Sequence, residues 1–84
     1  MFELIWLTDA MEQLSDIYVG RLKEAERDLL ALQVERLNRD LVRDPFEVGE
    51  SRDEPERVIV LSDVTVYFTV RAYEVRVTRV HRGS

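Results

Sequence analysis

The residues best suited to chemistry are gathered near the C-terminus, where the stretch from Arg57 to Arg82 holds five arginines and the only histidine. An imidazole such as that of His81 can take or give a proton near neutral pH. A histidine so close to a chain end is also often simply solvated. Arginine presents five donors in a planar fork that suits phosphate and carboxylate groups. The stretch therefore indicates either an anion-binding surface with a proton-transfer group or a solvated strand face.

The charge of the chain is divided between its two parts. Residues 1–56 hold 15 of the 17 carboxylates and 7 of the 12 basic residues, a net charge of −8. Residues 57–84 hold five arginines and two acids, a net charge of +3. A pI of about 4.8 argues against tight nonspecific nucleic-acid binding by the whole surface. This acidic pI does not exclude a local cationic groove.

Length and composition limit the class of protein. Eighty-four residues make one domain, residues 1–84. The chain has no cysteine, and a single histidine gives no metal-site pattern, so we expect no disulfide, metal or other cofactor. The longest apolar run is far shorter than the ~18 residues of a membrane span. Because Met1-Phe2-Glu3 lacks the basic start of a signal peptide, we expect a cytoplasmic protein.

The first 45 residues have the pattern of a strand followed by two helices. Phe2–Leu7 is apolar on both faces, which predicts a central strand. Thr8 and Asp9 predict a helix N-cap and an acid in the first turn, and Gly20 predicts a left-handed stop. Asp44-Pro45 ends the second helix. Apolar residues three and four apart predict the two buried stripes: Ala10, Met11, Leu14, Ile17 and Tyr18, then Leu22, Ala25, Leu29, Leu30, Leu32 or Gln33, Val34, Leu37 and Leu41.

The rest of the chain has the pattern of a loop and three strands. Residues 46–56 are rich in acids and contain Gly49 and Pro55, which predicts a loop that could shield the cationic strands. Strands are predicted at 58–61, 64–70 and 73–82, joined by short turns at 62–63 and 71–72. The order is β-α-α-β-β-β. We therefore predict an α+β fold in which a helical hairpin packs on one face of an antiparallel sheet.

Three arginines of the last predicted strand are spaced by three residues, against the period of two of a strand. Strict alternation puts Arg79 on the face opposite Arg76 and Arg82, and it puts Val80 with the arginines. A bulge between Val77 and Val80 resolves this conflict. The arginines then line either a solvated face, an ion-paired face or an anion-binding groove.

Along nearly its whole length the chain resembles the RelE/ParE superfamily of bacterial toxins from type II toxin–antitoxin systems. The joint order of several pieces carries the resemblance. They are a first strand ending in Trp6, the Ala10–Leu14–Ile17 helix, the junction LNRDLVRDPFEVGES, a strand opening at Arg57, the aromatic strand VYFTV and the ending VTRVHR.

One branch of this family cleaves messenger RNA in the ribosome by attack of a ribose 2′-hydroxyl on the adjacent phosphate. That chemistry needs proton-transfer groups and cations. The resemblance implies Arg57, His81 and Arg82 as catalytic residues. Arg76, Arg79 and Arg52 are then expected to bind RNA or an antitoxin. The central arginine expected in such an enzyme is replaced by Thr65, and no tyrosine follows Arg82.

The other branch implies a different activity, inhibition of DNA gyrase by binding, which needs no catalytic arginine. A third alternative is a nontoxic member that keeps only the fold and a partner. In each case the resemblance implies an antitoxin partner, and a homodimer is also open. Because antitoxin tails in this family are typically acidic, we predict that the strands rather than the helices make the electrostatic contact.

Overall fold

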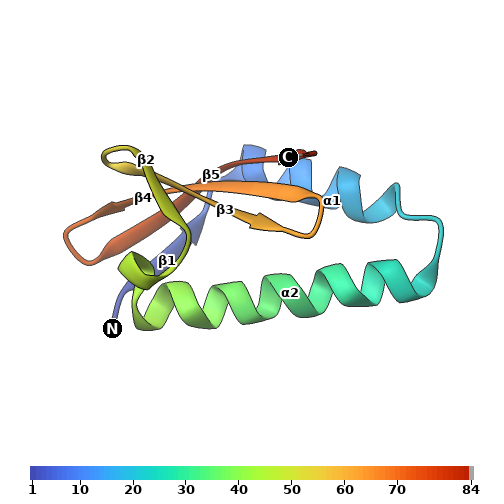
Figure 1. Ribbon diagram of the computed structural model, residues 1–84, viewed down its shortest axis with the longest axis horizontal. Helices are drawn as coiled ribbons and strands as arrows, with labels where there is room; N and C mark the ends of the chain where they lie inside the picture. The colour runs from blue at the N-terminus through green and yellow to red at the C-terminus, as the bar shows by residue number, and fades with distance from the viewer. Residues whose placement is uncertain (84) are drawn as a thin grey trace.

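Two helices cover one face of a five-stranded sheet, which confirms the α+β prediction (Figure 1). The structure is a computed structural model that describes residues 1–83. The sheet order is β1-β5-β4-β3-β2. The elements are β1 Glu3–Trp6, α1 Thr8–Val19, α2 Glu24–Arg43, the 3-10 turn η1 Pro45–Glu47, β2 Glu50–Asp53, β3 Glu56–Leu61, β4 Val64–Arg71 and β5 Glu74–Arg82.

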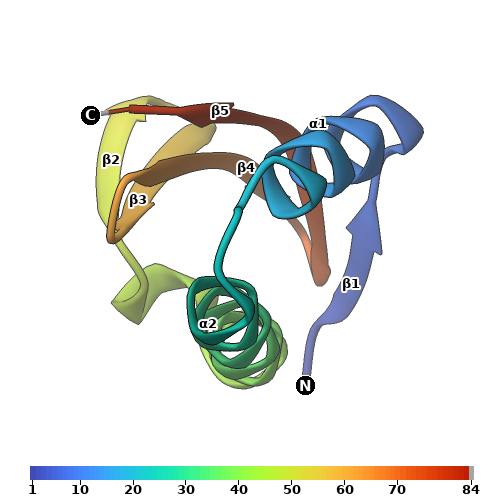
Figure 2. The ribbon, with the colours of Figure 1, turned by 90° about the vertical axis from the view of Figure 1, so that its right-hand side faces the viewer.

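The core lies between β4, β5 and the two helices. Phe68 of β4 is fully buried, and it packs in one cluster with Val77 of β5, Ala10 of α1 and Leu41 of α2. Full burial of each of the larger side chains, those of Phe68, Val77 and Leu41, stabilises the fold by about 1.5–3 kcal/mol. Because both helices supply residues to this cluster, they cover the same face of the sheet (Figure 2). No described helix is long and apolar enough to cross a membrane.

The sheet is mixed rather than antiparallel, because β1 pairs in parallel with β5. The prediction of a central first strand was also wrong, since β1 is an edge strand. Its apolar residues are only half-buried. On the helix side the Trp6 indole Nε1 donates to Asn38 Oδ1 of α2 at 2.8 Å. Because β1 packs against the helices, its sequence is as apolar as that of a central strand, although β1 lies at the edge of the sheet.

The helices occupy the predicted segments but end differently. Leu7, not Thr8, is the N-cap residue of α1, and its side chain makes no cap. Gly20 ends α1 as predicted, but with a right-handed φ of −72°, and its N–H donates to Asp16 O at 3.0 Å. The second helix ends at Arg43, just before Asp44-Pro45.

The segment 46–56 is not a plain loop, so that prediction was wrong. Pro45–Glu47 forms η1, and Glu50–Asp53 forms the edge strand β2, which pairs antiparallel with β3. Gly49 makes this turn with φ +65°, and a Cβ there would lie 2.2 Å from Val58 O. The acids of β2 are compatible with a strand because edge strands tolerate exposed charge.

Two tight hairpins join β3, β4 and β5. Both lack glycine, and a non-glycine residue takes the left-handed conformation in each: Ser62 with φ 57° and Ala72 with φ 53°. The second turn lies at residues 72–73, one residue later than predicted. Short turns fix the register of the strands that they join.

The bulge predicted in the last strand is present. Tyr67 pairs with Arg79 while the next residue, Phe68, pairs with Val77, so Thr78 has no partner in the ladder. The Thr78 hydroxyl donates to Tyr67 O at 3.3 Å. The extra residue lets Val77 and Val80 both face the core.

An ion pair joins the turn between the helices to the hairpin between β3 and β4. Arg21 holds Asp63 in a bidentate pair, with N···O distances of 2.9 and 2.5 Å. The hydrogen bond from Arg21 lowers the pKa of Asp63 below its usual value. Beside it, Gln33 of α2 donates to Ser62 Oγ at 2.8 Å.

The Arg21–Asp63 pair predicts acid sensitivity. The folded-state pKa of Asp63 lies below the unfolded value of about 3.9. The stabilisation is therefore fully present above that value and is lost as the pH falls through the folded pKa. In thermal melts from about pH 5 to pH 2, the wild type should lose more stability than Asp63→Asn. Asp28→Asn, on the exposed face of α2, is the control and should follow the wild type. Parallel curves for Asp63→Asn and the wild type would refute the assignment.

Candidate functional site on the open face of the sheet

The face of the sheet that the helices leave uncovered is hollowed into a trough of about 500 Å³. Its floor is β4, where Thr65 and Tyr67 point away from the core side chains of Val64, Val66 and Phe68. The walls come from β2 and β3 on one side and β5 on the other. The lining residues are Gly49, Glu50, Arg52, Val58, Ile59, Val60, Thr65, Tyr67 and His81.

Tyr67 contacts two other side chains on this open face, those of His81 and Arg79. The Tyr67 hydroxyl lies 3.1 Å from His81 Nε2, and the two ring centroids are 5.3 Å apart. The Arg79 guanidinium lies over the Tyr67 ring, 3.9 Å from its centroid. The Thr78 bulge causes this arrangement, because it places Arg79 opposite Tyr67 and His81 opposite Thr65. A tyrosine–histidine hydrogen bond and a guanidinium thus lie side by side on the open face.

Thr65 occupies the place where a central arginine was expected. It is 4% exposed, and its hydroxyl donates to Gly83 O at 2.7 Å. Thr65 therefore fixes the end of β5 and leaves no cation at this position. On the same face, Arg79 lies over the ring of Tyr67, and Arg52 lines the trough from β2.

The other predicted cations are distributed over both faces. The bulge brings Arg76 to the same face as Arg79, because it pairs with Thr69, and Arg76 forms an ion pair with Glu74. Arg82 pairs with Val64, whose side chain faces the core, so its register position belongs to the helix side. The structure thus gathers Arg79, His81 and Arg52 at the trough and leaves Arg82 outside it.

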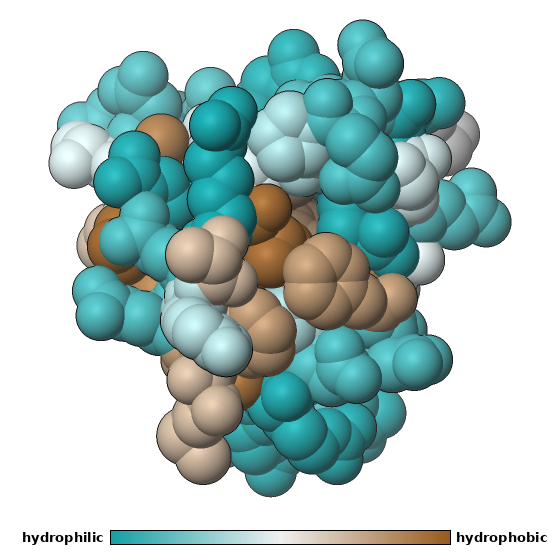
Figure 3. Space-filling model, turned by 90° about the vertical axis from the view of Figure 1, so that its left-hand side faces the viewer, coloured by the Kyte–Doolittle hydropathy of each residue, from teal (hydrophilic) through white to brown (hydrophobic). Residues whose placement is uncertain are grey.

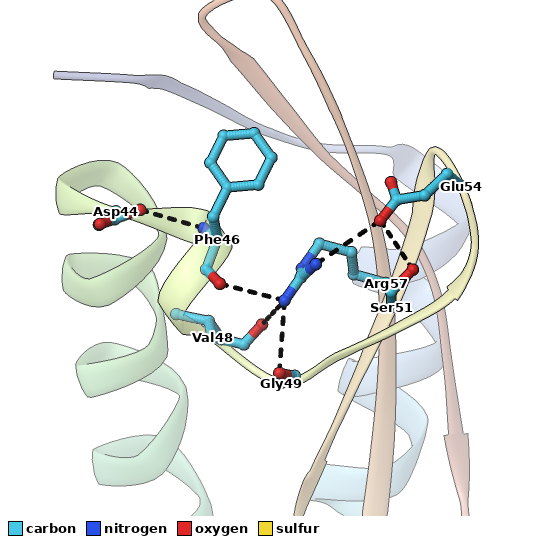
Figure 4. Close-up of polar contacts among 7 residues, drawn as sticks. All are labelled: Asp44, Phe46, Val48, Gly49, Ser51, Glu54 and Arg57. Carbon is cyan, nitrogen blue, oxygen red and sulfur yellow. Dashed lines mark hydrogen bonds and ion pairs between the residues drawn. The ribbon is translucent and has the colours of Figure 1, made fainter.

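Arg57 is held by the segment that precedes it (Figure 4). Its Nη2 donates to the carbonyl oxygens of Phe46, Val48 and Gly49 at 3.1, 3.4 and 3.4 Å. Its Nη1 lies 3.7 Å from Glu54 Oε1, and only 11% of its side chain is exposed.

Residues 45–54, which we call the strap, are therefore organised around Arg57. The Arg57 Nε is buried and has no hydrogen-bond partner among the described residues. In the register of β3, Arg57 lies opposite Phe68, on the face away from His81. The three predicted catalytic residues, Arg57, His81 and Arg82, thus do not converge.

Two apolar surfaces lie outside the trough. A groove of about 560 Å³ runs between α1 and α2 and is lined by Trp6, Met11, Leu14, Ser15, Tyr18, Leu30, Ala31, Val34, Glu35 and Asn38. At the end of the molecule that holds the N-terminus, apolar residues gather on the surface (Figure 3). There Phe2 contacts the rings of Phe46 and Tyr73, which are 56% and 76% exposed. Such surfaces are typical of protein–protein contacts.

Comparison with solved structures identifies the fold. A chain of the chromosomal ParDE toxin–antitoxin system from P. aeruginosa superposes with a TM-score of 0.76 at 19% identity, over 100% of this chain and 98% of that one. The RelBE2 toxin–antitoxin complex of Mycobacterium tuberculosis gives 0.70 at 22%, over 96% of each chain. A copper-bound mutant toxin from Helicobacter pylori gives 0.68 at 14%, over 98% of this chain and 94% of that one. The chain has the RelE/ParE toxin fold.

This likeness is one of fold, since the identities stay below 25%. No family model matches the sequence, and no curated protein matches it either. Within the RelE/ParE fold, sequence reasoning named His81 and Arg79 as separate candidates and missed Tyr67 as their partner. Two sequence signals were available: the alternation of β4, and the bulge that the arginine spacing required.

The strap gives a test of the structural role of Arg57. Arg57→Met keeps the apolar stem but removes the guanidinium that binds the three carbonyl oxygens and Glu54. We expect faster amide hydrogen exchange across residues 45–54, while the exchange of β4 and β5 stays unchanged. Arg36→Met, at an exposed position of α2, is the matched control. Unchanged exchange in the strap of Arg57→Met would show that the guanidinium does not organise it.

Proposed function

We propose that this protein is the toxin of a bacterial toxin–antitoxin pair and that it acts by cleaving messenger RNA on the ribosome. One observation carries the proposal: on the open face of a RelE/ParE fold, Tyr67 contacts both His81 and Arg79 beside a trough that Arg52 also lines. The work of such a protein would take place in the cytoplasm, where the ribosomes are.

The cluster supplies the groups that the reaction needs. Attack of a 2′-hydroxyl on the adjacent phosphate requires a group that takes the hydroxyl proton. His81 and Tyr67 are such groups. The reaction also requires positive charge next to the crowded phosphate. Arg79, one strand away from Thr65, takes the role of the missing central arginine, and Arg52 adds a second cation from β2.

An antitoxin partner fits the remaining surfaces. The groove between α1 and α2 is apolar and open, as a site for an amphipathic helix must be. The edge strands β1 and β2 offer unpaired backbone groups for an added strand. The cationic open face of β5 suits an acidic segment. By covering the trough, such a segment would also block the proposed active site.

A second candidate function is inhibition of DNA gyrase by binding. Two observations favour it over cleavage: Thr65 stands at the position of the central arginine, and the strap holds Arg57 away from the trough. Inhibition by binding needs neither an arginine at the central position nor a free Arg57.

Induced expression separates these functions. We expect growth arrest with new messenger RNA ends inside translated codons, and about 10²-fold less cleavage in His81→Ala because a proton-transfer group is lost. Arrest without RNA cuts but with a DNA-damage response would replace cleavage by gyrase inhibition. No arrest would leave a nontoxic binding module and refute the toxin proposal.

The antitoxin contact has its own test. Exchange of Arg76 and Arg79 for glutamate reverses the charge of the open face. It should weaken binding of the proposed antitoxin by about tenfold or more and flatten the salt dependence of that binding. The matched control reverses Arg36 and Arg39 on α2 and should bind like the wild type. Equal affinity and salt dependence in both variants would show that the strands do not make the electrostatic contact.

A further inference from the structure

The two ring nitrogens of His81 have partners of different kinds. Nδ1 lies 3.3 Å from the backbone oxygen of Arg82, and Nε2 lies 3.1 Å from the Tyr67 hydroxyl. A carbonyl oxygen only accepts hydrogen bonds, so in the neutral ring Nδ1 carries the hydrogen and donates it. The lone pair is then on Nε2, and the Tyr67 hydroxyl donates to it. These partners assign the tautomer.

This assignment changes which atom meets a bound hydroxyl group. The basic nitrogen of His81 is already occupied by the Tyr67 hydroxyl. Tyr67 lines the trough and is only 9% exposed. Its oxygen still has acceptor capacity, because a phenol that donates one hydrogen bond can also accept. The Tyr67 oxygen therefore stands between the histidine and a ligand.

Tyr67 is held both at its ring and at its backbone. Arg79 covers it at 3.9 Å, and the Thr78 hydroxyl binds its backbone carbonyl at 3.3 Å. Both neighbours follow from the bulge in β5. A proton-transfer group must stay within hydrogen-bond reach of the proton that it accepts. The fixed position of the Tyr67 ring and the orientation of its hydroxyl toward His81 meet this geometric requirement.

We propose that Tyr67 is the catalytic proton acceptor and that His81 takes the proton from it. The proposal rests on the ribonuclease function proposed above. The ribose 2′-hydroxyl gives its proton to the Tyr67 oxygen while the phenolic proton of Tyr67 passes to His81 Nε2. The bond from O2′ to phosphorus forms, and the bond from phosphorus to O5′ breaks. The departing O5′ takes a proton from water, and the imidazolium of His81 returns one proton to solvent.

In this relay, by which we mean proton transfer from Tyr67 to His81, the neighbouring Arg79 has a separate role. Arg79 lies against the ring of Tyr67 rather than its hydroxyl, so it leaves the path of the proton open. Its charge sits beside the place where the phosphate must lie for the 2′-hydroxyl to reach Tyr67. Tyr67 and His81 therefore handle protons, and Arg79 stabilises the charge of the phosphate.

A single-atom substitution tests the relay. Tyr67→Phe removes the hydroxyl but keeps the ring under Arg79. We expect ribosome-dependent cleavage of messenger RNA to fall about 10²-fold, as for the loss of a proton-transfer group. Tyr73→Phe removes a hydroxyl from a residue that is 76% exposed on another part of the molecule, and it should cleave like the wild type. Unchanged cleavage in Tyr67→Phe would overturn the proposal.

A spectroscopic readout of the free protein is independent of activity. In nitrogen-15 NMR spectra of neutral His81, the wild type and Tyr73→Phe should show the Nδ1–H tautomer, and Tyr67→Phe should lose this preference. An Nε2–H tautomer in the wild type would overturn the relay geometry. If the tautomers are as expected but the wild type arrests growth without cutting RNA, the ribonuclease function and the catalytic role of Tyr67 both fail, while the hydrogen-bonded pair stands.

Discussion

The structure depends on one extra residue in its last strand. Thr78 has no partner in the ladder between β4 and β5, and the alternation of β5 reverses there. On the helix-covered face of the sheet this keeps Val77 and Val80 in the core. On the opposite face it puts Arg79 and His81 beside Tyr67. Without the bulge, Arg79 would lie opposite Val66, among the buried side chains. The core and the candidate site thus rest on the same local irregularity.

Two arginines with largely buried side chains serve the fold. Arg57 gathers three carbonyl oxygens and Glu54 in the strap, and Arg21 holds Asp63 at the opposite end of β3. A buried guanidinium is costly unless its donors are paired, so neither is free to bind a phosphate in this conformation. At the trough the exposed arginines are Arg52 and Arg79. The two buried arginines thus serve the fold, while exposed positive charge lies at the open face of a chain that is acidic overall.

Much of the fold followed from local patterns, but the placement of the site residues did not. Period-two alternation identified β4, and the conflict between Arg79 and Val80 required the bulge. The edge position of β1 depended on helix contacts that strand periodicity does not encode. The strand β2 was missed because its residues are charged, and it exists through pairing with β3 and the left-handed Gly49. Arg57 opened a strand as expected, yet its burial in the strap depends on tertiary contacts.

The most direct test of this account is the pairing of β4 with β5 in solution. Cross-strand NOEs measured on the whole protein should connect Tyr67 with Arg79 and Phe68 with Val77, leaving Thr78 without a partner. A regular ladder gives a different set, with Tyr67 opposite Thr78 and Val66 opposite Arg79. The first pattern supports the account, because it places Arg79 and His81 on the open face. The second pattern would contradict it, because it turns both residues toward the helices and separates them from Tyr67.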